Sequence, residues 1–318
     1  MSQTRRARWI GLCGAGALSL VVACGTDDDT GNAENNGTAQ QDGGTPEGAS
    51  QTEDAAEALP TIVELAAGDD RFESLVAAVQ KAGLVDALNA AGPLTVFAPT
   101  DDAFETALST LGVTLDDLSA EQLAPILTYH VIEGAIRSTD LAGGPVTMLS
   151  GITAFVSTEG GAGLNDANVV IADLEASNGV VHVIDKVILP PNLVEAATLA
   201  GSFTTLLSAA GSADLVDTLG AEGADLTVFA PTDAAFSELT ELPTGDDLKN
   251  VLLYHVVAGK VLSSDLADGS VPSLWTGQSL TVDLSDGVRI NQAVVGPADI
   301  VTTNGVIHVI DSVLLPGD

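Results

Sequence analysis

Histidine side chains are the first candidates for chemistry in this 318-residue chain, which has four of them. His130 and His255 each follow a tyrosine, whereas His182 and His308 each lie in a His-Val-Ile-Asp run. Every histidine therefore has a counterpart in the same local sequence elsewhere in the chain. A single catalytic site does not need each histidine twice, so the duplication favours a structural role. His182 lies in an apolar, strand-like run, where we expect a buried and hydrogen-bonded side chain.

Motifs typical of enzymes are absent from the sequence. There is no Gly-x-Ser-x-Gly elbow, no His-Glu-x-x-His pair and no phosphate-binding glycine loop. The 44 aspartates and glutamates are so abundant that no pair stands out as a general acid and base. The sequence therefore predicts a non-catalytic protein without a cofactor or a metal site. A hydrolase acting on envelope polymers is the weaker alternative.

Both cysteines lie near the N-terminus, where the sequence resembles an export signal. Three arginines precede an apolar stretch over residues 9–22, which is too short to span a bilayer. Small residues then lead into Cys24, as in the lipobox of bacterial lipoproteins. The resemblance implies cleavage of a signal peptide, residues 1–23, and anchoring in the lipid bilayer through acylated Cys24. Ordinary secretory cleavage and an uncleaved anchor are the alternatives.

The next segment, residues 24–56, is predicted to be a disordered acidic tether. It contains almost no large apolar side chain and no lysine or arginine, so it cannot bury enough surface to fold. Over the whole chain the formal net charge is −34, which argues against binding to nucleic acid phosphates. An anionic partner such as an acidic polysaccharide would need bridging divalent cations.

The rest of the chain contains one sequence twice. The run TVFAPTD starts at Thr95 and again at Thr227, a Tyr-His-Val run follows each copy, and each copy closes on Asn-Gly-Val-(Val/Ile)-His-Val-Ile-Asp. A repeat of this length fits a whole domain rather than a solenoid unit. We therefore expect domains at residues 57–191 and 192–318. The first is longer by a short insertion between Phe104 and Tyr129.

Each shared run indicates a structural element. Apolar spacing predicts a helix over residues 72–88 with a break near Gly83. Residues 95–98 favour a short strand that ends at Pro99, and Thr100 is a typical helix N-cap. The Asn-Gly pair at residues 178–179 predicts a hairpin, because it readily adopts the positive φ angles of tight turns. Residues 180–189 are apolar on both faces, which is typical of a central, buried strand.

These runs together resemble the fasciclin domain, and the resemblance covers nearly all of residues 57–318 as a tandem pair. It implies an α+β fold in which each domain is a β-sandwich-like wedge with packed helices. It also implies a role in cell adhesion or extracellular-matrix binding. The adhesion residues that it offers are Tyr129, His130, Tyr254 and His255. The alternative is that these side chains only pack, in which case binding would fall to exposed loops or to the flanking valines and isoleucine: Val131, Ile132, Val256 and Val257.

The sequence as a whole predicts a lipid-anchored protein of a bacterial cell envelope. Gly25 follows the acylated cysteine in place of the aspartate that resembles an inner-membrane retention signal, so we expect the outer membrane or the cell surface. The expected partner is an extracellular or envelope protein or a polysaccharide. A periplasmic binding protein for a small apolar ligand is the main alternative, and it would need a pocket between helices and sheet.

Overall fold

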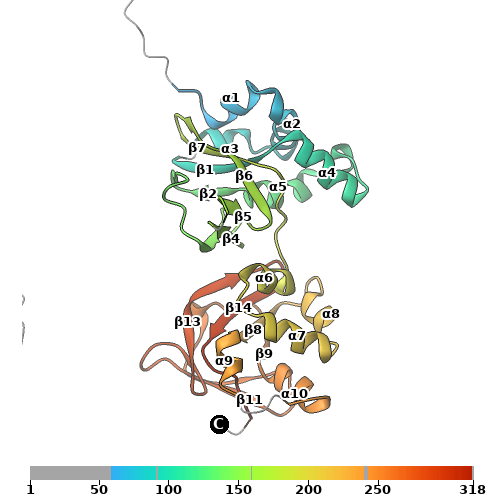
Figure 1. The fold of residues 1–318 in the computed structure, drawn as a ribbon, viewed down its shortest axis with the longest axis vertical. Coiled ribbons are helices and arrows are strands. Elements are labelled where there is room, and N and C mark those ends of the chain that lie inside the picture. The colour runs from blue at the N-terminus through green and yellow to red at the C-terminus, as the bar shows by residue number, and fades with distance from the viewer. Residues whose placement is uncertain (1–58, 91, 159, 240–242, 317–318) are drawn as a thin grey trace, which may run out of the picture. The chain divides into compact units, whose positions relative to one another are not determined.

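The computed structural model describes residues 59–90, 92–158, 160–239 and 243–316. These residues form two repeats of one α+β fold, each with a seven-stranded sheet and packed helices (Figure 1), so the predicted fold class and the tandem repeat are confirmed. The expected signal peptide, the expected tether and Cys24 lie outside the described residues.

The first repeat begins with helices, has one strand and further helices after them, and ends in a run of consecutive strands. Its helices, with η for 3₁₀-helices, are α1 (Ile62–Ala67), η1 (Asp70–Phe72), α2 (Glu73–Ala82), α3 (Val85–Ala90), α4 (Asp101–Leu111), η2 (Leu115–Asp117) and α5 (Ala120–Thr128). Its strands are β1 (Leu94–Pro99), β2 (Val131–Glu133), β3 (Gly144–Thr147), β4 (Thr153–Ser157), β5 (Gly163–Leu164), β6 (Ala167–Ala176) and β7 (Gly179–Ile184).

The second repeat has the same order of α-helices and strands, with different 3₁₀-helices and a shorter connection after its first strand. Its helices are α6 (Leu193–Ala200), α7 (Thr204–Ser212), α8 (Val216–Gly220), α9 (Asp233–Ser237), α10 (Asp246–Tyr254) and η3 (Ser263–Asp265). Its strands are β8 (Leu226–Pro231), β9 (Val256–Ala258), β10 (Gly269–Pro272), β11 (Ser279–Asp283), β12 (Arg289–Ile290), β13 (Ala293–Val301) and β14 (Gly305–Ile310).

Both sheets have one topology. The strand order is β2-β1-β7-β6-β5-β4-β3 in the first repeat, and the equivalent strands follow the same order in the second. Strand β7 pairs in parallel with β1 and antiparallel with β6, and it is buried from Val180 to Ile184. The prediction of a central, buried strand is confirmed, although the strand ends at Ile184 rather than Leu189.

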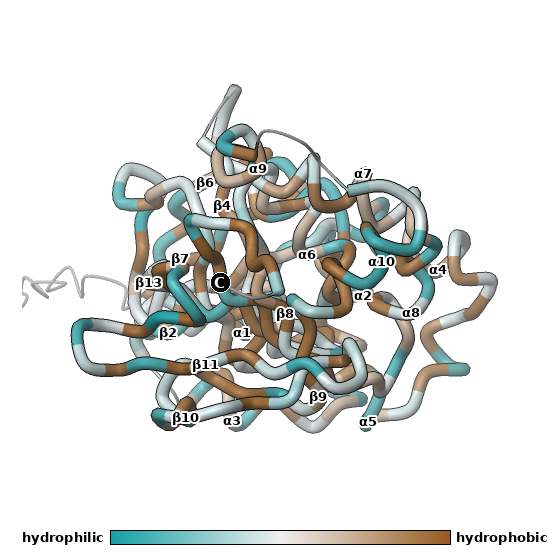
Figure 2. The backbone as a smooth tube through the Cα atoms, turned by 90° about the horizontal axis from the view of Figure 1, so that it is seen from below, coloured by the Kyte–Doolittle hydropathy of each residue, from teal (hydrophilic) through white to brown (hydrophobic). Residues whose placement is uncertain are grey.

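Each sheet buries both of its faces. In the first repeat one cluster joins the helices to the sheet, with Phe72, Val79 and Leu127 among its members. A second cluster, which includes Tyr129 and Leu164, packs the two halves of the sheet against each other and gives the sandwich-like wedge. In Figure 2 brown, hydrophobic positions occur along strands such as β11 and β4 and along helices, and teal, hydrophilic positions are common at the outer turns. Side chains on opposite faces thus serve two different cores.

The predicted helix over residues 72–88 is present in two parts. Helix α2 ends at Gly83, which takes a left-handed conformation with φ of 70°, and α3 begins at Val85. Glycine adopts this conformation without the steric cost of a Cβ atom. After this break the chain, with the half-buried Leu84 and Val85, continues in a direction different from that of α2.

The Thr-Asp pair after β1 connects two helices. Thr100 caps α4 as predicted, because its side chain accepts the N–H of Ala103. The Asp101 carboxylate accepts the N–H groups of Glu73 and Ser74 at 3.2 and 2.7 Å, at the start of α2. Asp101 therefore joins α2 to the end of β1, a contact that its position in the first turn of α4 did not reveal.

The predicted hairpin is present, but the reason given for its Asn-Gly pair is wrong. Neither residue has a positive φ. Gly179 is required because β1 passes so close that a Cβ atom there would collide with the Leu94 carbonyl oxygen. Asn178 accepts the N–H of Ile62 and donates to the Leu88 carbonyl, so it fixes the start of α1 and the end of α3 against the sheet.

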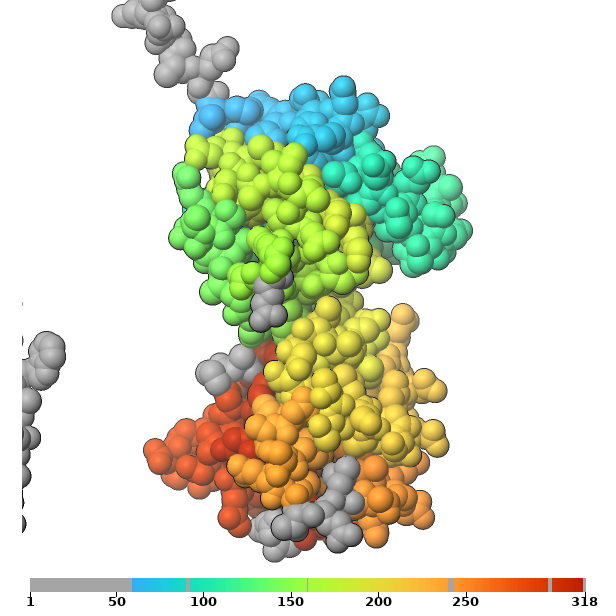
Figure 3. Space-filling view, in the orientation of Figure 1, coloured from blue at the N-terminus to red at the C-terminus, as the bar shows by residue number. Residues whose placement is uncertain are grey.

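The predicted insertion lies where the sequence placed it. Helix α4 has 11 residues, its counterpart α9 has 5, and η2 follows α4. These residues, in teal, project from the body of the first repeat in Figure 3. The insertion therefore changes the surface and leaves the sheet unchanged.

Candidate functional site

The tyrosines of the two Tyr-His pairs are buried and fully bonded. The Tyr129 hydroxyl donates to the Thr153 carbonyl at 3.0 Å and accepts from the Asn165 amide at 2.9 Å. The Tyr254 hydroxyl makes the equivalent two hydrogen bonds at 3.1 and 3.0 Å. Burial raises the pKa of Tyr129 to about 12. Both tyrosine side chains are therefore hydrogen-bonded structural residues inside the wedge.

The adjacent histidines tie a helix to the chain segment that follows the central strand. His130 Nδ1 donates to the Ile126 carbonyl at 2.7 Å, and Nε2 accepts the N–H of Ile188 at 3.1 Å. His255 repeats both bonds at 2.7 and 2.9 Å. Burial lowers the pKa of each histidine to about 4, so both rings are neutral near pH 7. A neutral ring with one donor and one acceptor suits these two backbone groups.

The second histidine pair differs between the repeats. His182 Nε2 donates to the Ile136 carbonyl at 2.9 Å, and Nδ1 accepts the N–H of Asp173, as expected for a buried structural histidine. His308 Nε2 makes the equivalent bond at 2.8 Å, but its Nδ1 faces the Asp299 carboxylate at 3.0 Å. In the second repeat a carboxylate thus faces the ring nitrogen that accepts a backbone N–H in the first repeat.

The four candidate adhesion residues therefore have a structural role in this fold. Their exposed fractions are 0% and 2% for Tyr129 and His130, and 3% and 2% for Tyr254 and His255. A direct contact between them and a partner stays a prediction. The four flanking residues proposed as the alternative binding surface are also buried, because both faces of their edge strands are covered. They are Val131, Ile132, Val256 and Val257.

The described residues offer no arrangement typical of metal or acid-base chemistry. No three His, Cys, Asp or Glu side chains among them are grouped to hold a metal ion. A catalytic acid needs a raised pKa, whereas the hydrogen bonds from Arg71 lower the pKa of Asp69 to about 2. Within this part of the chain, every carboxyl group with a shifted pKa is shifted downward.

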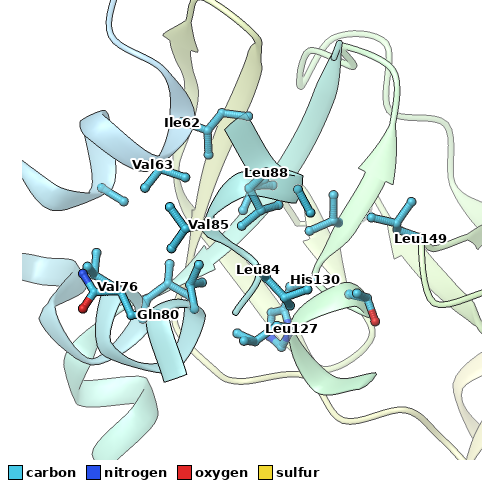
Figure 4. A pocket seen from close by; sticks show the side chains of 17 residues that line it. Ile62, Val63, Val76, Gln80, Leu84, Val85, Leu88, Leu127, His130 and Leu149 are labelled. Carbon is cyan, nitrogen blue, oxygen red and sulfur yellow. The ribbon is translucent and has the colours of Figure 1, made fainter. Parts of the chain in front are cut away.

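An apolar pocket lies beside the His130 ring in the first repeat. Its volume is about 150 Å³, and its lining exposes almost no polar atom. Figure 4 shows Ile62 and Val63 of α1 on one side, and Leu127 of α5 with His130 on the other. The pocket thus lies between helices and sheet, where a small apolar ligand was expected to bind if this chain binds one.

Sequence reasoning missed two groups of residues that shape this region. Asn178 and its counterpart Asn304 each bond backbone groups of two helices, which neither turn propensity nor apolar periodicity indicates. The second group lines the pocket. The sequence indicates this group through a residue that differs between the two copies of the repeat. Thr128 occupies the position that Leu253 occupies in the second copy.

The expected membrane anchor is not among the described residues. Within residues 59–316, apart from the short undescribed gaps, no helix is both long and apolar enough to cross a bilayer. Lipidation at Cys24 stays a prediction.

Comparisons with known proteins place both repeats in one family. The Fasciclin domain model matches residues 70–190 and 201–316. Protein sll1483 of Synechocystis sp. is 48% identical over 139 residues, which is 43% of this chain and 77% of that protein. Human periostin is 29% identical over 274 residues, which is 81% of this chain and 31% of periostin.

A solved structure has a similar pair of domains. The FAS1 domain pair of the insect cell adhesion molecule Fasciclin I covers 76% of this chain and 96% of its own, with a TM-score of 0.49 and 20% identity. The family assignment rests on the sequence matches, which include both copies of the repeat. This chain belongs to the Fasciclin domain family.

Proposed function

We propose that this chain is a lipid-anchored protein of a bacterial cell envelope whose two fasciclin domains act as a non-catalytic adhesion or matrix-binding module. The observation that carries the proposal is the tandem pair of fasciclin domains behind a lipobox-like cysteine, Cys24. The family resemblance supplies the adhesive role, and the N-terminal pattern supplies the location.

The surface available for adhesion consists of loops and outer faces, because the Tyr-His pairs are buried. Several large apolar side chains are exposed in the described residues, among them Leu111 at the end of the projecting α4 and Val170 on β6, with exposed fractions of 53% and 54%. Such isolated apolar side chains among acidic residues fit a polar contact surface with a few apolar contact points.

The charge of the domains restricts the partner. Of the seven lysines and arginines after Cys24, four form ion pairs with nearby carboxylates: Arg71, Arg137, Lys186 and Lys260. Few cations are left to attract an anionic polymer directly. We therefore expect a neutral or cationic partner, or an acidic polysaccharide bridged by divalent cations.

Fractionation tests the anchoring part of the proposal. Cys24→Ser, or inhibition of the lipoprotein signal peptidase with globomycin, should move the protein from the membrane to the soluble fraction. Cys13→Ser is the matched control and should leave the distribution unchanged. An unchanged distribution for Cys24→Ser would contradict anchoring.

Binding of the purified chain tests the adhesive part. The protein should increase aggregation of cells or be retained on matrix protein or polysaccharide, and retention on acidic polysaccharide should disappear with a chelator. Broad screening against hydrolase substrates should give no turnover. Reproducible cleavage of an envelope polymer would replace this proposal with the hydrolase alternative.

A further inference from the structure

The apolar pocket of the first repeat is large enough to hold a molecule. A cavity of about 150 Å³ lined by aliphatic side chains stays dry and can bind benzene or xenon, whereas a well-packed core has few voids larger than a water molecule. This pocket has that volume. In Figure 4, Gln80 of α2 and Leu149 lie on opposite sides of it. Leu149 is 40% exposed, so one wall reaches the surface.

Two of the three polar side chains in the lining, those of His130 and Thr128, are already hydrogen-bonded, and the third, Gln80, is an exposed residue. Both ring nitrogens of His130 are bonded to backbone groups, so the ring can offer only carbon atoms to the pocket. The Thr128 hydroxyl donates to the Ala124 carbonyl at 2.8 Å within its own helix. A ligand with hydrogen-bonding groups would lose its bonds to water on entry and regain few of them, because the lining exposes almost no polar atom. The pocket therefore favours a hydrocarbon-like molecule.

No cation in the described residues is available to hold a charged ligand here. Lys81, at the end of α2, donates to the carbonyls of Leu115 and Asp116, both at 2.9 Å. The chain is strongly acidic, with a net charge of −34, so a carboxylate at the mouth would be repelled. Fatty acids and other anions are therefore poor ligands, even when their apolar part would fit.

The second repeat shows what a filled version of this pocket looks like. The equivalent cavity has about 30 Å³ and lies between α6, α7 and α8 and the strands β8 and β14. Leu253 takes the place of Thr128 and packs against the core, and Leu274 takes the place of Leu149 and packs there too. The equivalence of the two leucines is structural, since Leu149 and Leu274 each donate their N–H to the edge strand at 2.7 Å.

A second position acts in the same direction. Val76 on α2 corresponds to Leu207 on α7, which also packs against the core of the second repeat. Two larger side chains thus occupy space that the first repeat leaves open. The helices and the strand β8 that line the smaller pocket correspond to elements that line the larger one, so we attribute the smaller opening to these side chains.

We propose that the pocket between α1, α2, α3 and α5 of the first repeat binds an uncharged, hydrocarbon-like molecule about the size of one six-membered ring, and that the second repeat has lost this site. Larger apolar ligands would extend past Leu149. The site is separate from the adhesive surface, so either assignment can fail without the other.

Methyl NMR of the purified full chain, titrated with toluene and with benzoate, tests the proposal. Toluene should shift methyl signals of Leu84, Val85 and Leu149 at a Kd of about 0.1 to 1 mM and leave those of Leu253 and Leu274 unchanged. Benzoate has the same ring with a carboxylate and should bind at least tenfold more weakly.

Variants show whether the shifts arise in the pocket. Thr128→Leu, which copies the second repeat, should weaken toluene binding at least tenfold, and Val76→Leu provides a second filling variant if the first does not fold. Thr128→Val keeps the volume and is the matched control, with binding within twofold of the original chain. Toluene binding that survives both filling variants, equal shifts in the two repeats, or benzoate binding as tight as that of toluene would overturn the proposal.

Discussion

The two repeats share the buried polar contacts of their Tyr-His pairs and strand-start asparagines, and they differ in their apolar volume. Asn178 and Asn304 make corresponding bonds to helix ends, and His130 and His255 bond corresponding backbone groups within about 0.2 Å of the same distances. The pocket beside these histidines nevertheless shrinks from about 150 to about 30 Å³. A lost buried hydrogen bond leaves a polar group without a partner, whereas a changed volume can be absorbed by neighbouring side chains. The arrangement of helices and sheet in this fold is thus held by buried polar contacts, and the volume of its interior cavity is free to vary.

The largest expected effect concerns the glycine that starts the central strand. Gly179→Ala and Gly305→Ala should each prevent folding of their repeat or cost more than about 4 kcal/mol, because the new Cβ would collide with a strand carbonyl. Gly211→Ala is the control, since α7 leaves open space there, and it should be neutral or slightly stabilising. Urea unfolding followed by circular dichroism measures all three. A small cost at only one of the two strand glycines would show that the two repeats do not pack this glycine against the neighbouring strand in the same way.

The next effect is a shared pH dependence. Burial lowers the pKa of His130 and of His255 from the ordinary value of 6.5 to about 4 in the folded chain. Between these values the unfolded state binds the proton and the folded state does not, so stability falls as the pH drops from about 6.5 to 4. The loss should be roughly 3 kcal/mol for each repeat.

Fluorescence separates the two repeats in this experiment. Trp275 is the only tryptophan after Trp9, and it packs edge-on against Tyr254. Unfolding followed by Trp275 should lose its pH dependence above pH 4 in His255→Gln and keep it in His130→Gln. Carboxylates such as Asp233, with a pKa of about 2, contribute only at lower pH. Stability that does not change between pH 7 and 4.5 would contradict the assigned neutral rings.

A smaller effect comes from exchanging the residues that fill the pocket. Leu253→Thr should destabilise the second repeat by about 2 kcal/mol, because it removes apolar contacts and leaves a cavity. Thr128→Leu should stabilise the first repeat by up to about 1 kcal/mol by filling one. Thermal unfolding of the two variants measures the difference. If both substitutions destabilise their repeats, the pocket of the first repeat does not have room for a leucine side chain at position 128.

The smallest effect concerns an ion pair that only the first repeat has. Arg137 bonds Glu175 at 2.7 Å on the surface, and the equivalent positions in the second repeat are Leu262 and Val301. Both charged side chains are at least half exposed, so Arg137→Ala should cost less than about 0.5 kcal/mol. The free energy of unfolding is measured with urea in low and high salt. A larger cost would show that surface charge also contributes to a difference in stability between the two repeats.

Much of this fold follows from local sequence. The run that starts at Thr95 predicts a short strand followed by a capped helix, because strand propensity and capping act over a few residues. The position of the insertion follows from comparing the copies. What could not be predicted depends on contacts between distant segments. Gly179 meets a carbonyl of β1, and Asp101 caps a helix that begins 28 residues earlier.

The candidate site shows the same limit. The Tyr-His pairs are recognisable by their repetition, yet repetition does not show whether a side chain is buried or exposed. The tyrosines are buried by packing between the halves of the sheet, whereas His130 lies beside the pocket between helices and sheet. The pocket was foreseen only as a general possibility, because its volume depends on side chains from four helices, two strands and the connections between elements. The difference between Thr128 and Leu253 was visible in the sequence, but its meaning required the fold.

Attachment of intact cells tests the central claim, adhesion by an anchored pair of fasciclin domains, most directly. A strain that lacks this protein should attach poorly to a surface, and the original chain should restore attachment. Cys24→Ser should leave the domains folded but released and should not restore it. Normal attachment of the deletion strain, or full rescue by Cys24→Ser, would contradict the account.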